Sequence, residues 1–358
     1  MQSGADYQLK WPRQLFRSEA YALVNNTGPQ DWSERCELLL EDAFVGVAPR
    51  DDFTAIQNSL DKQKFLASLL RRTDLLKEAP TDRVPYWSER QRSRKPGAVS
   101  LLATAREFIR AVDELEADGY FEMAFEKDCV DAPANVEPSD IFSRELDVSD
   151  VWPLNAKRLS KDVDLFCDVI EVLHDLVARP RARYFHSYSG CGWHHESFSV
   201  EAGQVLYRWR VNRLLGKSDI GLQLAAEGED VGRLAAVTDD ARTALAASMT
   251  ARTDPSTGDL VRHAIALFRA RNATEHDKRS AVIALAGVLE ERRGLLKTEL
   301  VSNDEGALFQ IANGFAVRHR KDNQRTDYDP VFLDWLFWWY LATIELTDRI
   351  LARQAATS

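Results

Sequence analysis

The sequence predicts a mainly α-helical, multidomain protein with one small β-hairpin and a C-terminal four-helix bundle. Apolar residues recur at helical spacing through most of the chain, as in "SERCELLLEDAFVGV" (33–47). One segment, "IGLQLAAEGEDVGRLAAV" (220–237), instead shows two short strand-like runs around a turn. At 358 residues the chain is long enough for two or three domains.

Composition narrows the class of protein. Hydrophobic residues make up 45% and charged residues 28% of the chain, as in ordinary globular proteins. The net charge of -10 argues against a protein that coats nucleic acid with its whole surface. The N-terminus lacks the apolar core of a signal peptide, and the longest apolar run, "WLFWWYLATI", is too short to span a bilayer. We therefore expect a cytoplasmic protein with reduced cysteines, no membrane partner and no cofactor.

The first two regions are mostly helical. Residues 1–150 contain three strong helical patterns separated by Pro-rich breaks, and Ser33 is the expected cap of the first. Residues 151–250 contain two more helices, the first with Ser160 as its expected cap, and the predicted hairpin. We interpret the stretch between these two helices, "RARYFHSYSGCGWHHESFS", as a loop. "TARTDPSTGD" then has the composition of a linker.

The C-terminal region, residues 259–354, is expected to form the bundle. Its four helical patterns are 259–270, 275–299, 304–320 and 330–353. Thr274 and Asp277 nearly match a capping box and mark the start of the second helix. Pro330 suits the first turn of the fourth helix.

The end of the third predicted helix, "FAVRHRKDNQRTDYD", is rich in positive charge. Arg318 and His319 follow Phe315 by three and four residues, so both begin on the apolar stripe of this helix. Four cations and one acid lie between residues 318 and 325, a pattern suited to phosphate. The alternative is that the helix dipole simply favours cations at a C-terminus.

This region resembles a known family. The segments "SAVIALAGVLE", "LFQIANGFAVRH" and "YDPVFLDWLFWWYLATI" are similar, in pattern and order, to the HEPN domain of bacterial abortive-infection proteins, particularly the AbiJ-like group. The middle region also looks similar to the part before HEPN in that group. The resemblance implies a four-helix bundle that often dimerises and cleaves RNA without a metal. An Arg holds the phosphate and a His transfers a proton.

The resemblance also implies site residues. HEPN motifs space Arg and His by four to six residues, but Asn323, Gln324 and Arg325 occupy the matching positions after Arg318, where only the adjacent His319 is available. The candidate catalytic residues are Arg318, His319, Asn323 and Gln324. The candidate RNA-binding residues are Arg320, Lys321 and Arg325. An alternative catalytic set with the motif's spacing is Arg271, Asn272 and His276.

A second group of reactive residues lies in "HSYSGCGWHH". His186, Cys191, His194 and His195 are residue types that bind zinc, and C-x-x-H is a workable chelate spacing. Structural zinc usually needs a second well-spaced pair, and only His174 lies nearby in sequence. We therefore expect no metal here. The loop either packs against the neighbouring helix or offers Tyr184, Tyr188 and Trp193 for stacking on bases.

The final helix is apolar on all sides, which indicates burial on several sides or a dimer face. We expect a homodimer, with RNA and a protein from the same operon as further candidate partners. The favoured function is an RNA-directed effector, a metal-independent endoribonuclease in a bacterial defence or toxin-like system. One alternative is a non-catalytic HEPN-like interaction or sensing module. Another is a small-molecule or metal-dependent enzyme that uses the His-rich loop.

Overall fold

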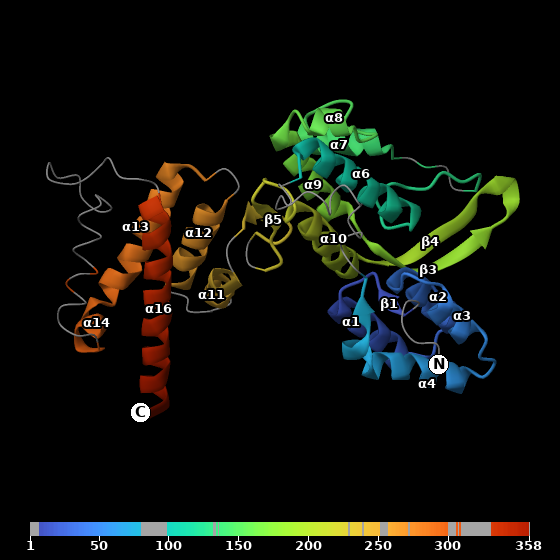
Figure 1. Cartoon of the computed structure of the whole chain (residues 1–358), viewed down its shortest axis with the longest axis horizontal. Helices are drawn as coiled ribbons and strands as arrows, with labels where there is room; N and C mark the ends of the chain where they lie inside the picture. The colour runs from blue at the N-terminus through green and yellow to red at the C-terminus, as the bar shows by residue number, and fades with distance from the viewer. Residues whose placement is uncertain are drawn as a thin grey trace, which may run out of the picture. The chain divides into compact units, whose positions relative to one another are not determined.

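The protein folds as two compact units. The computed structural model describes residues 7–79, 99–131, 134, 136–227, 230–237, 240–250, 257–270, 273–299, 306, 308 and 331–357. The first unit is Met1–Leu224 and the second is Ala225–Ser358 (Figure 1). The first spans the predicted 1–150 region and most of the 151–250 region, and the second contains the predicted bundle.

The first unit is built mainly from helices. They are α1 (Arg13–Asn25), α2 (Trp32–Ala43), α3 (Ala48–Thr54), α4 (Ser59–Arg71), α6 (Leu101–Ala117), α7 (Pro138–Leu146), α8 (Ala156–Leu159), α9 (Val163–Leu176) and α10 (Val200–Leu215). Two short strands, β1 (Gln8–Leu9) and β2 (Lys77–Glu78), pair in parallel. Helix α1 packs on α2, α4 and α10, while α6 and α9 pack on α10.

Two predicted helix caps in this unit are wrong. Helix α2 begins at Trp32, so Ser33 lies inside its first turn and donates to Glu37 instead. Helix α9 is capped by Asp162, whose carboxylate accepts the backbone N–H of Leu165. Ser160 instead follows the last residue of the short helix α8, which the sequence analysis did not predict.

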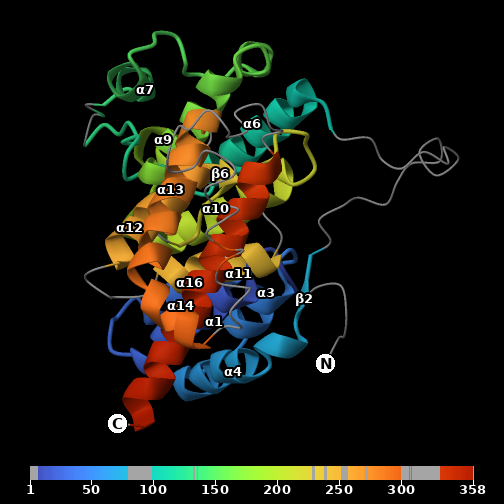
Figure 2. The same ribbon diagram turned by 90° about the vertical axis from the view of Figure 1, so that its left-hand side faces the viewer.

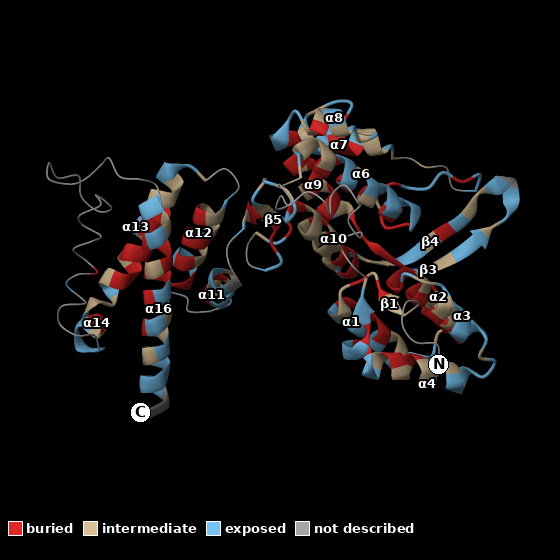
Figure 3. Ribbon diagram, viewed as in Figure 1, coloured by how far each residue is buried: buried red, intermediate tan, exposed pale blue. Residues whose placement is uncertain are grey.

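The largest departure from prediction is a long hairpin. The segment interpreted as a loop forms strands β3 (Arg179–His186) and β4 (Gly192–Ser199), which pair antiparallel from Arg179–Ser199 to His186–Gly192. Figure 1 shows both strands extending beyond the helices of their unit, and Figure 3 shows that they are exposed along much of their length. The strands hold few β-branched residues, so the usual sequence signal of a strand is weak.

A buried ion network holds the base of this hairpin. Nη1 of Arg179 donates to Oε2 of Glu19 on α1 at 2.6 Å, and its Nε lies 3.4 Å from Oδ2 of Asp42 on α2. The Tyr120 hydroxyl donates to the same Asp42 oxygen at 2.7 Å. The guanidinium carbon lies 4.7 Å from the centre of the Trp11 ring. Arg179, Glu19 and Asp42 are all buried, so the hairpin is fixed by charges that need one another.

The second unit contains a helical bundle. Its helices are α11 (Asp240–Thr250), α12 (Gly258–Arg269), α13 (Glu275–Glu291), α14 (Arg293–Glu299) and α16 (Val331–Thr357). Helices α12, α13 and α16 run side by side around a buried apolar core (Figure 2). The predicted capping box is confirmed, because Thr274 and Asp277 exchange hydrogen bonds at the start of α13. The third predicted helix, 304–320, lies almost wholly outside the described residues.

One predicted helix of the bundle is interrupted. The pattern at 275–299 predicted a single helix, but α13 ends at Glu291 and α14 begins at Arg293. Between them, Arg292 donates to Asp348 at 2.5 Å, to Thr347 at 2.7 Å and to Thr257 at 3.0 Å. Arg292 thus joins the end of α13 to α16 and to the residue that precedes α12.

The described residues confirm the predicted mainly α class. The two short strands predicted at 220–237 are present as β5 (Leu222–Leu224) and β6 (Leu234–Ala236). Within the described part of the chain, no helix is long and apolar enough to cross a membrane.

Candidate functional site

The β3–β4 hairpin is contacted along one edge by the chain that follows α6. This crossing segment, residues 119–131, begins at Gly119, whose φ of 81° lets the chain turn away from the helix. Glu122 accepts both the backbone N–H of His195 at 2.9 Å and a hydrogen bond from its Nδ1 at 2.7 Å. Lys127 donates to the carbonyl of Trp193 at 2.6 Å. The crossing segment is therefore tied to β4 at two points.

Four sulfur and nitrogen donors meet between the crossing segment and the hairpin. They come from Cys129, His186, Cys191 and His194, and one donor atom from each lies within 4.8 Å of all the others. His186 ends β3, Cys191 precedes β4, and His194 faces the same side of the hairpin as His186 because it pairs with Tyr184. Cys129 comes from the crossing segment. Together they form a Cys₂His₂ cluster.

The cluster corrects the reasoning behind the expectation of no metal. That expectation depended on the lack of a further ligand near His186, Cys191 and His194, and Cys129 supplies it from 57 residues before His186. His195 is not part of the cluster, because its ring is held by Glu122. His174 is not part of it either, since its Nε2 meets Nη1 of Arg208 at 2.8 Å.

The contacts of Glu122 with His195 lower the pKa of the Glu122 carboxyl group. Burial favours its protonated form, but the two hydrogen bonds from His195 outweigh burial and hold the pKa of Glu122 below its ordinary value. Oε1 of Glu122 also lies 3.9 Å from Nδ1 of His194. A stable negative charge therefore sits beside one member of the cluster at neutral pH.

The opposite face of the hairpin carries an exposed aromatic pair. Phe185 and Trp193 face each other across the strands, with ring centres 5.2 Å apart, and are 59% and 45% exposed. The guanidinium of Arg183 lies 4.4 Å from the centre of the Trp193 ring. We call Arg183, Phe185 and Trp193 the aromatic platform. It combines flat apolar surface with a guanidinium that is also paired with Glu41 at 2.6 Å.

The other aromatic residues of the hairpin lie against the cluster. The Tyr184 ring stacks on His194 at 5.3 Å, and the Tyr188 ring stacks on His186 at 6.3 Å. Of the three aromatic residues that the sequence offered for base stacking, Trp193 therefore lies on the aromatic platform. Tyr184 and Tyr188 stack on the cluster's histidines with one face, while 53% and 68% of their surfaces stay exposed.

The residues assigned through the HEPN resemblance cannot be placed on this site. The main set, Arg318, His319, Asn323 and Gln324, lies outside the described residues, as do Arg320, Lys321 and Arg325. Of the alternative set, Arg271 and Asn272 also lie outside them, and His276 is exposed in the first turn of α13. These assignments stay predictions.

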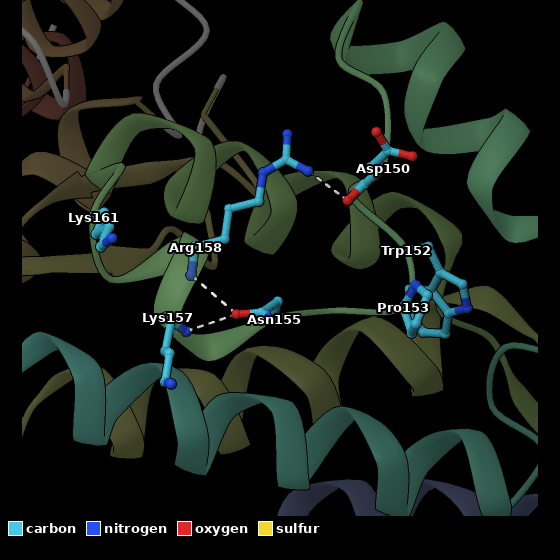
Figure 4. Close-up of a pocket in the computed structure, with 7 residues that line it drawn as sticks. All are labelled: Asp150, Trp152, Pro153, Asn155, Lys157, Arg158 and Lys161. Atoms are coloured by element: carbon cyan, nitrogen blue, oxygen red, sulfur yellow. Dashed lines mark hydrogen bonds between the residues drawn. The ribbon is translucent and has the colours of Figure 1, made fainter.

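A pocket on the first unit, with a volume of about 580 Å³, is lined by basic side chains that do not point to a common position. In Figure 4 the side chains of Lys157, Arg158 and Lys161 point in different directions. The guanidinium of Arg158 is already bound to the carbonyls of Ser149 and Asp150. The three charges therefore do not converge on one ligand position.

Comparison of this chain with known protein families, with curated proteins and with solved structures gives no match. The assignment of function therefore depends on the chemistry of its own residues.

Proposed function

We propose that the protein is an RNA-directed effector that contacts RNA bases through the aromatic platform. The observation that carries this proposal is the pairing of two exposed rings with a guanidinium on a projecting hairpin. Contiguous exposed apolar surface, unlike single exposed residues, often marks a binding site. Unpaired bases stack on such rings at about 1–3 kcal/mol per base, whatever their sequence. The guanidinium of Arg183 lies over the Trp193 ring and donates to Glu41 at 2.6 Å, so it holds the ring in place.

The overall charge of -10 fits a local contact of this kind. A uniformly acidic surface repels RNA, so binding must concentrate where aromatic and basic residues gather. The hairpin gathers aromatic residues, while its arginines Arg181 and Arg183 are paired with Glu19 and Glu41. Stacking, rather than charge alone, would then provide the affinity, and single-stranded RNA is the class that exposes its bases.

The finer proposal is metal-independent cleavage of RNA by the C-terminal bundle. Its support is the resemblance to HEPN domains, together with the packing of α12, α13 and α16 around one core. In this proposal Arg318 holds the scissile phosphate and His319 transfers a proton, with Asn323 and Gln324 as hydrogen-bonding support. Arg320, Lys321 and Arg325 would bind the neighbouring backbone.

Cleavage is tested by incubating the full chain with total RNA in EDTA. We expect degradation that Arg318→Ala abolishes and that His319→Ala reduces by about 10²–10⁴-fold, the usual effect of losing a proton-transfer group. The matched control is the pair Arg271→Ala and His276→Ala, with unchanged melting required of every variant. Loss of activity only in the control pair would move the site to the start of α13. Intact RNA with the parent protein would refute cleavage.

A non-catalytic interaction module is the second candidate, and a specific feature favours it. Val331, Phe332 and Trp335 are exposed at the start of α16, next to the part of the helix that packs into the core. Such residues suit a contact with a second copy of the chain or with a partner protein encoded nearby. A protein that sediments as a homodimer and leaves RNA intact in the assay above would favour this candidate.

A further inference from the structure

We propose that Cys129, His186, Cys191 and His194 bind one Zn²⁺ ion, which fixes the hairpin to the crossing segment. The proposal is independent of RNA cleavage, because the ligands lie in the first unit. It stands on three observations: the separations of the donor atoms, an unpaired buried nitrogen, and the carboxylates behind the two histidines.

Two of the separations match a tetrahedral metal, and all four donor atoms lie within 4.8 Å of one another. The sulfurs of Cys129 and Cys191 lie 3.7 Å apart, and Sγ of Cys129 lies 3.3 Å from Nδ1 of His186. Around a tetrahedral zinc, with bonds of about 2.3 Å to sulfur and 2.0–2.1 Å to nitrogen, neighbouring donors lie about 3.3–3.8 Å apart. A disulfide would instead bring the sulfurs to about 2.05 Å, and all four cysteines are free.

The unpaired nitrogen belongs to His194. Its side chain is only 8% exposed, and among the described residues its Nε2 has no hydrogen-bond partner. A buried polar atom without a partner costs about 1–3 kcal/mol, so native proteins rarely leave one. A zinc ion among the four donors would take up this lone pair.

The far side of each histidine ring meets a carboxylate. Nε2 of His186 lies 3.4 Å from Oδ2 of Asp131, which leaves its Nδ1 facing Cys129. Nδ1 of His194 faces Glu122 at 3.9 Å, which leaves its Nε2 for a metal. Histidines that bind zinc usually have such a carboxylate or carbonyl behind them, because it fixes the ring and makes the metal-bound nitrogen more basic.

The four ligands indicate which metal ion binds and whether that ion is structural or catalytic. Two thiolates with two imidazoles in tetrahedral positions are typical of zinc rather than of magnesium or calcium, which prefer oxygen. Four protein ligands leave no position for water or substrate, so the ion would be structural. It would close a loop from Cys129 to His186 and hold the hairpin that carries the aromatic platform.

The test is the metal content of the full chain, purified in reductant without added metal. We expect about one zinc per chain, and none after Cys129→Ser or His194→Asn. Cys36→Ser is the matched control, because Cys36 is a buried thiol of the same unit whose pKa burial raises to about 12. His263→Asn, at an exposed histidine of α12, is the second control. Both controls should keep the zinc.

Cobalt substitution keeps the test decisive if the variants fail to fold. The parent protein loaded with Co²⁺ should show the charge-transfer absorption of bound thiolates and the visible bands of a tetrahedral site. The proposal would be overturned if the parent protein contains no metal and takes up neither zinc nor cobalt. It would also be overturned if Cys129→Ser keeps the zinc, or if Cys129 and Cys191 form a disulfide in place of the metal site. The RNA-cleavage assay contains EDTA, so the zinc that the parent protein keeps in that buffer is measured as well. The zinc site and RNA cleavage are then tested separately.

Discussion

Replacing Arg179 by methionine is expected to lower the free energy of unfolding of the first unit by about 3–5 kcal/mol. The change leaves the buried carboxylates of Glu19 and Asp42 without the cation that joins them. Methionine keeps an apolar stem of similar length against Trp11, so the loss would report the charge rather than packing. Denaturant unfolding followed by circular dichroism measures it.

Two controls accompany the Arg179→Met variant: the pH dependence of its stability loss, and the matching variant at Arg181. Burial favours protonated Glu19, but the hydrogen bond from Arg181 and the charge of Arg179 hold the pKa of Glu19 below its ordinary value. Its contribution to stability is therefore present at neutral pH and lost as the pH falls through its folded pKa. The effect of Arg179→Met should shrink in acid. Arg181→Met, at a partly exposed position, should cost only about 1–2 kcal/mol. Equal costs for the two variants would contradict the account.

Replacing Gly119 by alanine is expected to cost about 2–4 kcal/mol and to loosen the hairpin. The φ of 81° at this position disfavours any Cβ by about 1 kcal/mol or more. The added Cβ would also lie 2.3 Å from Nδ1 of His195, so the ring held by Glu122 must move, at about 1–3 kcal/mol. Thermal unfolding of the parent and the variant measures the sum.

Gly190 separates the two causes. It has a similar φ of 77°, but a Cβ there would have no neighbour within 4 Å. Gly190→Ala should therefore show only the backbone cost, about 1–2 kcal/mol. If both variants lose the same stability, the contact between the crossing segment and His195 does not matter to the fold.

Local signals in the sequence predicted several helices, such as α2, α6 and α9, but did not indicate α1, α3, α7, α8 or α11. Thr274 and Asp277 cap α13 as expected, because a capping box needs only residues three positions apart. The break at Arg292 was not predictable in the same way. Its partners, Thr257 and Asp348, lie 35 and 56 residues away, and the local pattern continues as a good helix. Long-range hydrogen bonds thus override a helical pattern at this point.

In the hairpin and its cluster, too, local sequence patterns were informative only where the structure depends on neighbouring residues. Strands rich in Arg, His and aromatic residues lack the Val and Ile runs that usually reveal a strand, so β3 and β4 were interpreted as a loop. The spacing of Cys191 and His194 indicated a chelate, but Cys129 joins it only through the turn at Gly119 and the contacts of Glu122. A second cysteine 62 residues away was the one available signal.

The central claim, that the hairpin binds RNA, is tested most directly by the affinity of the full chain for a single-stranded RNA. The parent protein should bind, and the double variant Phe185→Ala, Trp193→Ala should bind about tenfold or more weakly, because each lost stack is worth about 1–3 kcal/mol. Tyr21→Ala is the matched control, since Tyr21 is a 62% exposed aromatic residue on α1 of the same unit. An unchanged affinity in the double variant, or no binding by the parent protein, would contradict the account.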